Sequence, residues 1–150
     1  AMDPPGYDFT SFPEVVRSAR EAYAQAGISD PRAAVSLAEV HDCFTPTEIV
    51  LMEDLGFSSP GQAWKDVLAG GEFDADGTLP VNIDGGLKSF GHPVGASGLR
   101  MLFEAWLQLR GEAGGDRQLT DPHTALTHNL GGRPGGACVS FVSIVGRERG

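Results

Sequence analysis

The chain has 150 residues, which fits one domain with a modest core, and 41% of them are hydrophobic, which argues against disorder. Its net charge of −9 argues against nucleic acid and anionic membranes as partners, because both require a basic surface. It contains no apolar run long enough to span a membrane and no signal peptide, so we expect a cytoplasmic protein.

The first residues are not expected to belong to the fold. Ala1-Met2-Asp3-Pro4 looks like a scar from an expression vector. The segment from Pro4 to Ser11 has no hydrophobic periodicity and contains adjacent prolines, which indicates an extended linker. Residues 1–11 are therefore interpreted as scar and linker, and residues 12–150 as one folded domain.

Helices and a strand alternate in the first part of the chain. Apolar residues at helical spacing predict a helix over residues 12–26, with Gly27 at its end. A turn is expected at residues 28–32. The short apolar segment 34–40 predicts a buried strand.

Two further helices are expected before the central loop. One begins near Thr45 and is stopped by Gly56. The other spans residues 59–70, with Ser59 as its cap and Pro60 at its first position. The residues of this second helix that are expected to face the core are Ala63, Trp64, Val67 and Leu68.

The second half begins with a short strand at residues 79–83, and residues 96–109 predict a long helix. Residues 124–130 and 137–145 predict two strands joined by a glycine-rich turn at 131–136, most simply as an antiparallel hairpin. Helices that alternate with strands, followed by a hairpin, are typical of an α/β fold with a mixed sheet.

The loop over residues 82–98 is where we expect chemistry. Its five glycines permit positive φ and close approach of other atoms, and Pro93 fixes the backbone next to His92. An imidazole held just before a helix start can stabilise a developing negative charge. From the spacing alone, a glycine-rich turn with an incidental histidine is an equally good interpretation.

Three motifs lie in order along the chain: His41-Asp42-Cys43-Phe44; Asn82-x-x-Gly85-Gly86 with Gly91-His92-Pro93-x-Gly95-Ala96-Ser97-Gly98; and His128-Asn129-Leu130-Gly131-Gly132. They resemble the active-site loops of the thiolase family. The first and third motifs carry the residues of the sterol-carrier-protein type, where ordinary thiolases have Asn-Glu-Ala-Phe and Cys-x-Gly. The resemblance extends from about Phe12 to Val145 and matches the C-terminal half of a thiolase.

This resemblance implies a thiolase-like C-terminal domain, in which a mixed sheet has helices on both faces and ends in an antiparallel hairpin. It also implies that the N-terminal half, with its nucleophilic cysteine, and one sheet strand upstream of Phe12 are absent from this sequence. The parent, a homo-oligomer, would cleave 3-ketoacyl-CoA with coenzyme A or run the reverse Claisen condensation. The coenzyme A thioester is a substrate, no bound cofactor is expected, and the chain alone is expected to be inactive.

The resemblance assigns catalytic roles to three side chains. His92 would activate the nucleophilic cysteine and polarise the thioester oxygen, which suits an imidazole at neutral pH. Cys43 would transfer protons, because the subtype places its acid/base cysteine in this loop. His41 occupies the position of an asparagine that orients a water or thioester oxygen, and both direct contact and a supporting role stay open. Asp42 would orient a side chain or, more simply, cap the following helix.

Further positions are expected to bind substrate or to line its pocket: Asn82, Gly91, His128, Asn129 and Gly131. For His128 and Asn129 a structural role is an equally good interpretation. No metal site is expected, since the histidines and cysteines lack close ligand spacing. Cys138 is expected in the core and His123 in solvent.

Two other functions stay open for the parent. A thiolase-fold subunit can be an aldolase that cleaves a steroid or acyl-CoA side chain with a partner that carries a zinc ribbon and an OB fold. It can also be a non-catalytic assembly subunit. The turn at 131–136 contains Arg133-Pro134, a departure from the family's glycine loop that leaves the substrate open.

Overall fold

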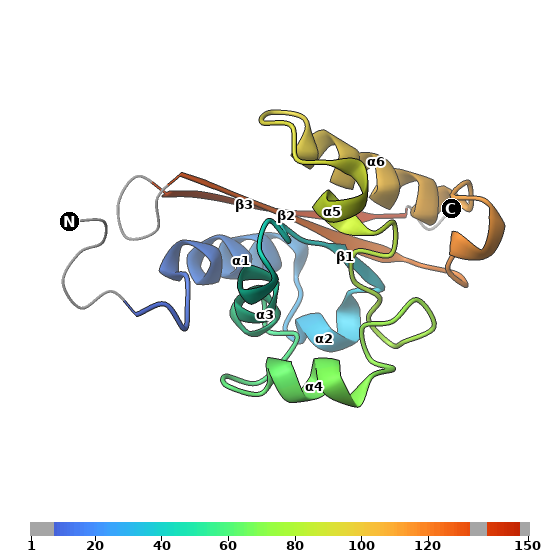
Figure 1. The fold of residues 1–150 in the computed structure, drawn as a ribbon. Helices are drawn as coiled ribbons and strands as arrows, with labels where there is room; N and C mark the ends of the chain where they lie inside the picture. Colours follow the sequence, from blue (N-terminus) through green and yellow to red (C-terminus); the bar gives the residue numbers. More distant parts are fainter. Residues whose placement is uncertain (1–7, 133–137, 148–150) are drawn as a thin grey trace.

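A computed structural model describes residues 8–132 and 138–147 of the chain (Figure 1). The expected vector scar and the first part of the expected linker lie outside the described residues. The Arg133-Pro134 segment of the hairpin turn lies outside them as well.

One sheet organises the described part of the chain, and its strands are β1 (Leu37–Glu39), β2 (Thr124–Gly132) and β3 (Cys138–Gly146). They lie side by side in the order β1-β2-β3. β1 runs parallel to β2, and β3 runs antiparallel to β2. The expected mixed sheet and closing hairpin are therefore confirmed.

Helices cover both faces of this sheet, as expected (Figure 1). In chain order they are α1 (Pro13–Ala26), α2 (Pro31–Ala34), α3 (Thr45–Asp54), α4 (Ala63–Ala69), α5 (Gly86–Phe90), α6 (Ser97–Arg110) and the 3-10 turn η1 (Gly115–Arg117). In Figure 1, α6 lies on one face of the sheet, and α1 and α3 lie on the other.

Each strand contributes to two cores, because successive residues of a strand point to opposite faces. Ala38 and Leu126 join the larger core, which α1, α3 and the first residue of α4 complete. Their neighbours Leu37 and Ala125 pack instead against Ala105 of α6. β1 and the first half of β2 are thus buried on both faces.

Three elements differ from the sequence-based expectation near the sheet. The expected turn at 28–32 contains the start of α2, because the Asp30 side chain accepts a hydrogen bond from the Ala33 N–H and Pro31 occupies the first turn. The strand expected over 34–40 is shortened to β1 for the same reason. The strand expected at 79–83 is reduced to a single parallel bridge between Val81 and Ala38.

The helix expected over residues 59–70 begins later than predicted, at Ala63, and Ser59 is not its cap. The carboxylate of Glu53 explains the shift, since it accepts hydrogen bonds from the backbone N–H groups of Gly61 and Ala63 and holds this segment as a turn. Ala63 is buried as predicted. The prediction was wrong for the other apolar side chains of α4, which are exposed: Trp64, Val67 and Leu68.

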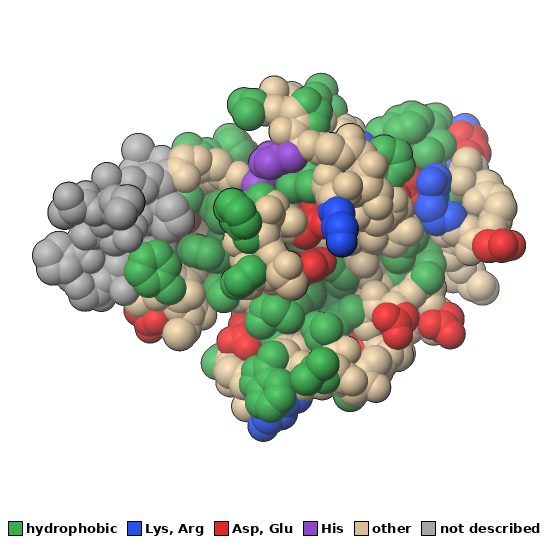
Figure 2. Space-filling view, in the orientation of Figure 1, with side chains coloured by type: hydrophobic (Ala, Val, Ile, Leu, Met, Phe, Trp, Pro, Cys, Tyr) green, Lys and Arg blue, Asp and Glu red, His purple; other side chains and the backbone are tan. Residues whose placement is uncertain are grey.

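The long helix α6 agrees with its prediction within one residue at each end, but its faces are unusual. It buries Glu104 and Gln108 against the domain. The apolar side chains that it exposes are Leu99, Leu102, Phe103 and Trp106, which we call the α6 stripe. In Figure 2, hydrophobic side chains gather on the surface near α6 and near α4.

Candidate active site

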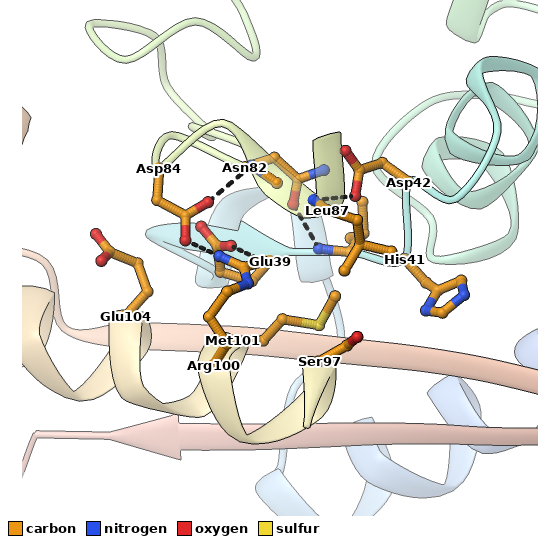
Figure 3. A network of polar contacts seen from close by, with 12 residues as sticks. Glu39, His41, Asp42, Asn82, Asp84, Leu87, Ser97, Arg100, Met101 and Glu104 are labelled. Carbon is orange, nitrogen blue, oxygen red and sulfur yellow. Dashed lines mark hydrogen bonds and ion pairs between the residues drawn. The ribbon is translucent and has the colours of Figure 1, made fainter. Parts of the chain in front are cut away.

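Three segments meet where β1 ends, and they bring most of the predicted site residues together. The chain that leaves β1 carries His41 and Cys43. The segment between α5 and α6 carries His92, and β2 carries Asn129. Figure 3 shows His41 and Ser97 close to this meeting point. The carboxyl ends of parallel strands are the usual place for a ligand site in α/β folds.

His92 is exposed, and the first residue of α6 fixes one side of its ring. Its Nδ1 lies 2.8 Å from Oγ of Ser97. The carbonyl oxygen of Pro93 lies 3.1 Å from the same hydroxyl and is an alternative acceptor for its proton. When Ser97 donates to Pro93, it accepts the Nδ1–H of His92, and Nε2 of the neutral ring keeps its lone pair. In that tautomer His92 can accept a proton at Nε2.

His41 lies beside His92 and is held by β2. The two rings meet edge to face, with centroids 4.7 Å apart and planes at 79°. Nδ1 of His41 lies 3.2 Å from Oδ1 of Asn129, whose amide N–H₂ group faces the sulfur of Met101. Burial and the neighbouring His92 lower the pKa of His41. His41 is therefore a neutral, oriented imidazole at neutral pH.

Two cavities open on either side of His92. One, of about 440 Å³, is lined by His41, His92, Asn129 and Gly131 together with apolar side chains of β3. The other, of about 470 Å³, is lined by His92 and Cys43 and by the segment around Asp42. His92 borders both cavities, so a group held in either one can lie next to its ring.

Asp42 connects the loop after β1 to α5. Its Oδ1 accepts a hydrogen bond from the Leu87 N–H, at 2.9 Å (Figure 3). Gly86 permits this approach, because it has φ of 61° and a Cβ there would collide with the Asp42 carboxylate. The prediction that Asp42 caps the following helix was wrong. That helix, α3, has Phe44 at its N-cap position and no side-chain cap.

Asn82 lies behind the site rather than in it. Its Oδ1 accepts from the Val40 N–H and its Nδ2 donates to Glu48, both at 2.8 Å. Its φ of 51° lies in the left-handed region, which asparagine tolerates better than most residues. Among the described lining residues, neither cavity includes Asn82 or Gly91. Asn82 therefore supports the ends of β1 and α3, and its expected contact with substrate stays a prediction.

His128 is fully buried next to Asn129 on β2. Its Nε2 lies 3.3 Å from Oγ of Ser140, and its Nδ1 has no hydrogen-bond partner among the described residues. Burial, aided by His41, lowers the pKa of His128 to about 3. His128 is therefore a neutral group behind the cavity that Asn129 lines.

The two remaining histidine and cysteine side chains lie away from this site. Cys138 is half-buried in β3 rather than fully in the core, and burial raises its pKa. His123 is exposed as predicted, and its Nε2 lies 3.2 Å from Asp121.

Across residues 8–132 and 138–147, no cluster of potential metal ligands occurs. Within the same ranges, no helix has the length and hydropathy needed to cross a membrane.

Sequence reasoning did not assign a role to Ser97 or to the amide of Asn129 as partners of the histidines. Ser97 carried a usable signal, since it opens the predicted helix five residues after His92 and a hydroxyl there can reach back into the loop. The pairing of Asn129 with His41 had no local signal. The two residues are 88 positions apart and meet only because β1 pairs with β2.

Comparison with known proteins identifies the class to which this fold and site belong. A family model described as thiolase C-terminal domain-like matches residues 6–145. The chain therefore belongs to this family, which confirms the resemblance of the three motifs and the expected fold.

The relatives are all much longer than this chain. It is 41% identical over 136 residues to an acetyl-CoA acetyltransferase of Methanothermobacter thermautotrophicus, which covers 91% of this chain and 34% of the relative. It is 40% identical over 134 residues to sterol carrier protein 2 of Rattus norvegicus, covering 89% of this chain and 22% of that protein.

A solved structure titled "Ltp2-ChsH2(DUF35) aldolase" superimposes with a TM-score of 0.78 and 30% identity, over 97% of this chain and 35% of the other. The chain thus spans about a third or less of the proteins that it matches.

Proposed function

We propose that this chain supplies the His92 and Cys43 side of a thiolase-type active site, and that its parent transfers acyl groups between coenzyme A thioesters. One observation carries the proposal: Oγ of Ser97 lies 2.8 Å from Nδ1 of His92 and within reach of the Pro93 carbonyl, which supports the tautomer with a free base at Nε2 beside a neutral His41. Relatives named acetyl-CoA acetyltransferase support the same reaction class.

In this proposal the nucleophile is a cysteine in the part of the parent outside this chain. Its thiol proton passes to Nε2 of His92 while the sulfur attacks the 3-keto carbonyl of the substrate. The resulting imidazolium then donates its Nε2–H to the oxyanion. Because burial keeps His41 neutral, no second positive charge opposes the protonation of His92.

Cys43 takes the second proton transfer. Collapse of the tetrahedral intermediate breaks the bond between C2 and C3, and the departing acetyl-CoA carbanion takes a proton from the Cys43 thiol. The Cys43 thiolate accepts the proton of an incoming coenzyme A thiol, which attacks the acyl-enzyme. The released nucleophilic cysteine recovers its proton from His92. The shared cavity of Cys43 and His92 is consistent with this division of roles.

The α6 stripe supports the proposal that the rest of the parent packs on this chain. Phe103 and Trp106 stack on the outside of α6 with ring centroids 5.8 Å apart, and both are about half exposed. Contiguous exposed apolar side chains typically mark an interface. This chain covers 34% of each of two matched relatives, so about two thirds of their length lies outside it. The corresponding part of the parent is our candidate for the segment that covers the stripe.

A second candidate is an aldolase, and the likeness to the solved structure titled as an aldolase favours it. In that case the parent would cleave the side chain of an acyl-CoA and would work with a partner, with a zinc-ribbon and OB-fold protein as our candidate. The residue at the nucleophile position of the full-length protein discriminates the two, since a thiolase requires a cysteine there. A non-catalytic assembly subunit would show no turnover in either assay.

The test is thiolysis of acetoacetyl-CoA and of a longer 3-ketoacyl-CoA by the full-length parent. His92→Ala and Cys43→Ala should each lower turnover at least about a hundredfold, because each removes a general acid or base. The matched controls are His123→Ala and Cys138→Ala, which lie outside both cavities and should retain turnover. A folded parent without thiolysis would refute the thiolase assignment and direct the work to the aldolase assay.

A further inference from the structure

Arg100 connects the elements that carry the two site histidines, although it lines neither cavity. It lies on α6, three residues after Ser97. Its Nη2 lies 3.3 Å from Oε2 of Glu39 on β1, two residues before His41. Its Nη1 forms an ion pair with Asp84, in the turn that precedes α5. Figure 3 shows the guanidinium between the two carboxylates.

The same side chain also contacts the other end of α5. The guanidinium carbon of Arg100 lies 5.1 Å from the centre of the Phe90 ring, in a cation–π contact. Phe90 ends α5 and precedes the Gly91-His92 pair. Asp84, at the start, accepts a hydrogen bond from the Gly86 N–H at 2.8 Å. Arg100 therefore contacts the segment on both sides of α5.

The three charged side chains are largely buried, which makes their mutual contacts important for the fold. The side chains of Glu39 and Asp84 are 0% and 1% exposed, and that of Arg100 is 16% exposed. A buried carboxylate without its cationic partner is strongly unfavourable, so the arginine and the carboxylates fix one another's positions. The planar fork of Arg100 presents Nη2 to Glu39 and Nη1 to Asp84, a geometry that the single ammonium group of a lysine does not reproduce.

We propose that Arg100 is a positioning residue that sets the separation of His41 and His92 by joining Glu39 on β1 to Asp84 and Phe90 at the ends of α5. The inference rests on the proposed function, because it deepens the account of the same site. It assigns no contact with substrate to Arg100. Its effect passes through β1 to His41, and through α5 to His92.

The test records imidazole signals by NMR in this chain, where four histidines give separate probes. Arg100→Met removes the guanidinium and should shift the His41 and His92 signals and weaken the contact between their rings. His123 is exposed and directly precedes β2, so its signal should stay unchanged. Arg100→Lys should restore the signals only in part. Arg110→Met is the matched control, because Arg110 is on the same helix and its partners among the described residues are Glu112 and Trp106, both exposed.

Three results would overturn the proposal. The first is a folded Arg100→Met protein with unchanged His41 and His92 signals. The second is an equal shift of His123, which would indicate a general change of structure. The third applies where Arg100→Met does not fold: Asp84→Asn then cuts only the connection to α5, and an unchanged His92 signal contradicts the proposal. A shifted His92 signal in Asp84→Asn, with His123 unchanged, supports it.

A kinetic readout separates positioning from binding in the full-length parent. Arg100→Met should lower kcat about tenfold to a hundredfold while KM for the acyl-CoA stays unchanged, because a small misplacement of a catalytic group has an effect of this size. A raised KM with normal kcat would overturn the proposal. The NMR result does not depend on turnover, so a failed positioning proposal and a failed thiolase assignment are distinguishable.

Discussion

Oγ of Ser97 lies 2.8 Å from Nδ1 of His92 and 3.1 Å from the carbonyl oxygen of Pro93. In our proposal the hydroxyl donates to Pro93 and accepts from Nδ1, so that Nε2 of His92 is free. The chemistry proposed for the site depends on it, because only an unprotonated Nε2 can take a proton from a thiol.

The first prediction concerns this hydroxyl. Ser97→Ala removes the acceptor of the Nδ1–H group, and a hydrogen bond of this kind contributes about 1 kcal/mol. We expect turnover of the full-length parent to fall about fivefold, since about 1.4 kcal/mol corresponds to a factor of ten in rate. Ser89→Ala on α5 is the matched control and should retain turnover. Equal turnover in wild type and Ser97→Ala would mean that the hydroxyl does not orient His92.

The second prediction concerns pH. His128 is buried with its pKa lowered to about 3, whereas an unfolded histidine has a pKa of about 6.5. The unfolded chain therefore gains a proton below about pH 6.5 that the folded chain does not. The stabilising contribution of neutral His128 is present above pH 6.5 and is lost as pH falls, by about 1.4 kcal/mol per pH unit.

Some buried carboxyl groups stabilise the fold as pH falls, which opposes the effect of His128. The measurement must therefore compare the pH dependence of stability in a His128 variant with that of wild type. Burial raises the pKa of Glu48, so its contribution to stability grows as pH falls through its folded pKa toward its unfolded value. Urea unfolding at pH 5 and pH 7 should show a smaller loss of stability at pH 5 in His128→Gln than in wild type. His123→Gln, an exposed control, should match wild type. Parallel pH dependences in His128→Gln and wild type would contradict the assignment.

The third prediction concerns the close approach of α6 to β2. A Cβ built on Gly98 would lie 3.0 Å from Nδ2 of Asn129. Gly98→Ala should push the Asn129 amide away from His41 and destabilise the domain by about 1–3 kcal/mol. Gly131→Ala meets no atom within 4 Å and should leave stability unchanged. Thermal unfolding of both variants checks this, and equal melting temperatures would refute it.

The fold was predictable from local patterns where those patterns were strong. The stripe of apolar residues predicted α1 within a few residues. The glycine-rich turn between two apolar segments predicted the hairpin of β2 and β3. The limits of β1 were not predictable, because Asp30 and Pro31 favour a helical turn that competes with the strand. The late start of α4 depends on Glu53, which caps backbone groups eight and ten residues away.

The site was predictable only in part. The motifs pointed to His41, Cys43 and His92 as site candidates, because each residue lies within a short motif: His41 and Cys43 in one, His92 in another. Arg100 and the pairing of Asn129 with His41 were beyond this reasoning, since each residue meets its partner through the packing of α6 and β2 on β1. Spacing also predicted the helix α6 but not which of its faces packs on the sheet. The apolar side chains of the α6 stripe point outward, whereas Glu104 and Gln108 are buried.

The fourth prediction uses the α6 stripe. In this chain, Phe103→Ala and Trp106→Ala remove exposed side chains and should change the free energy of unfolding by about 1 kcal/mol or less. In the full-length parent, the same substitutions should cost about 3–5 kcal/mol, as expected for buried aromatic side chains. Chemical denaturation of both proteins measures the difference. A parent as tolerant as the isolated chain would show that the stripe is not covered by the rest of the parent.

The most direct measurement is acetylation of the full-length parent by acetyl-CoA, followed by mass spectrometry over time. The account predicts that wild type acquires an acetyl group on a cysteine outside this chain and that Cys43→Ala does so more slowly, because Cys43 protonates the departing coenzyme A thiolate in this step. His92→Ala should acetylate at least about a hundredfold more slowly. An unmodified wild type, or acetylation of His92→Ala at the normal rate, would contradict the role of His92 as the base of a thiolase-type site.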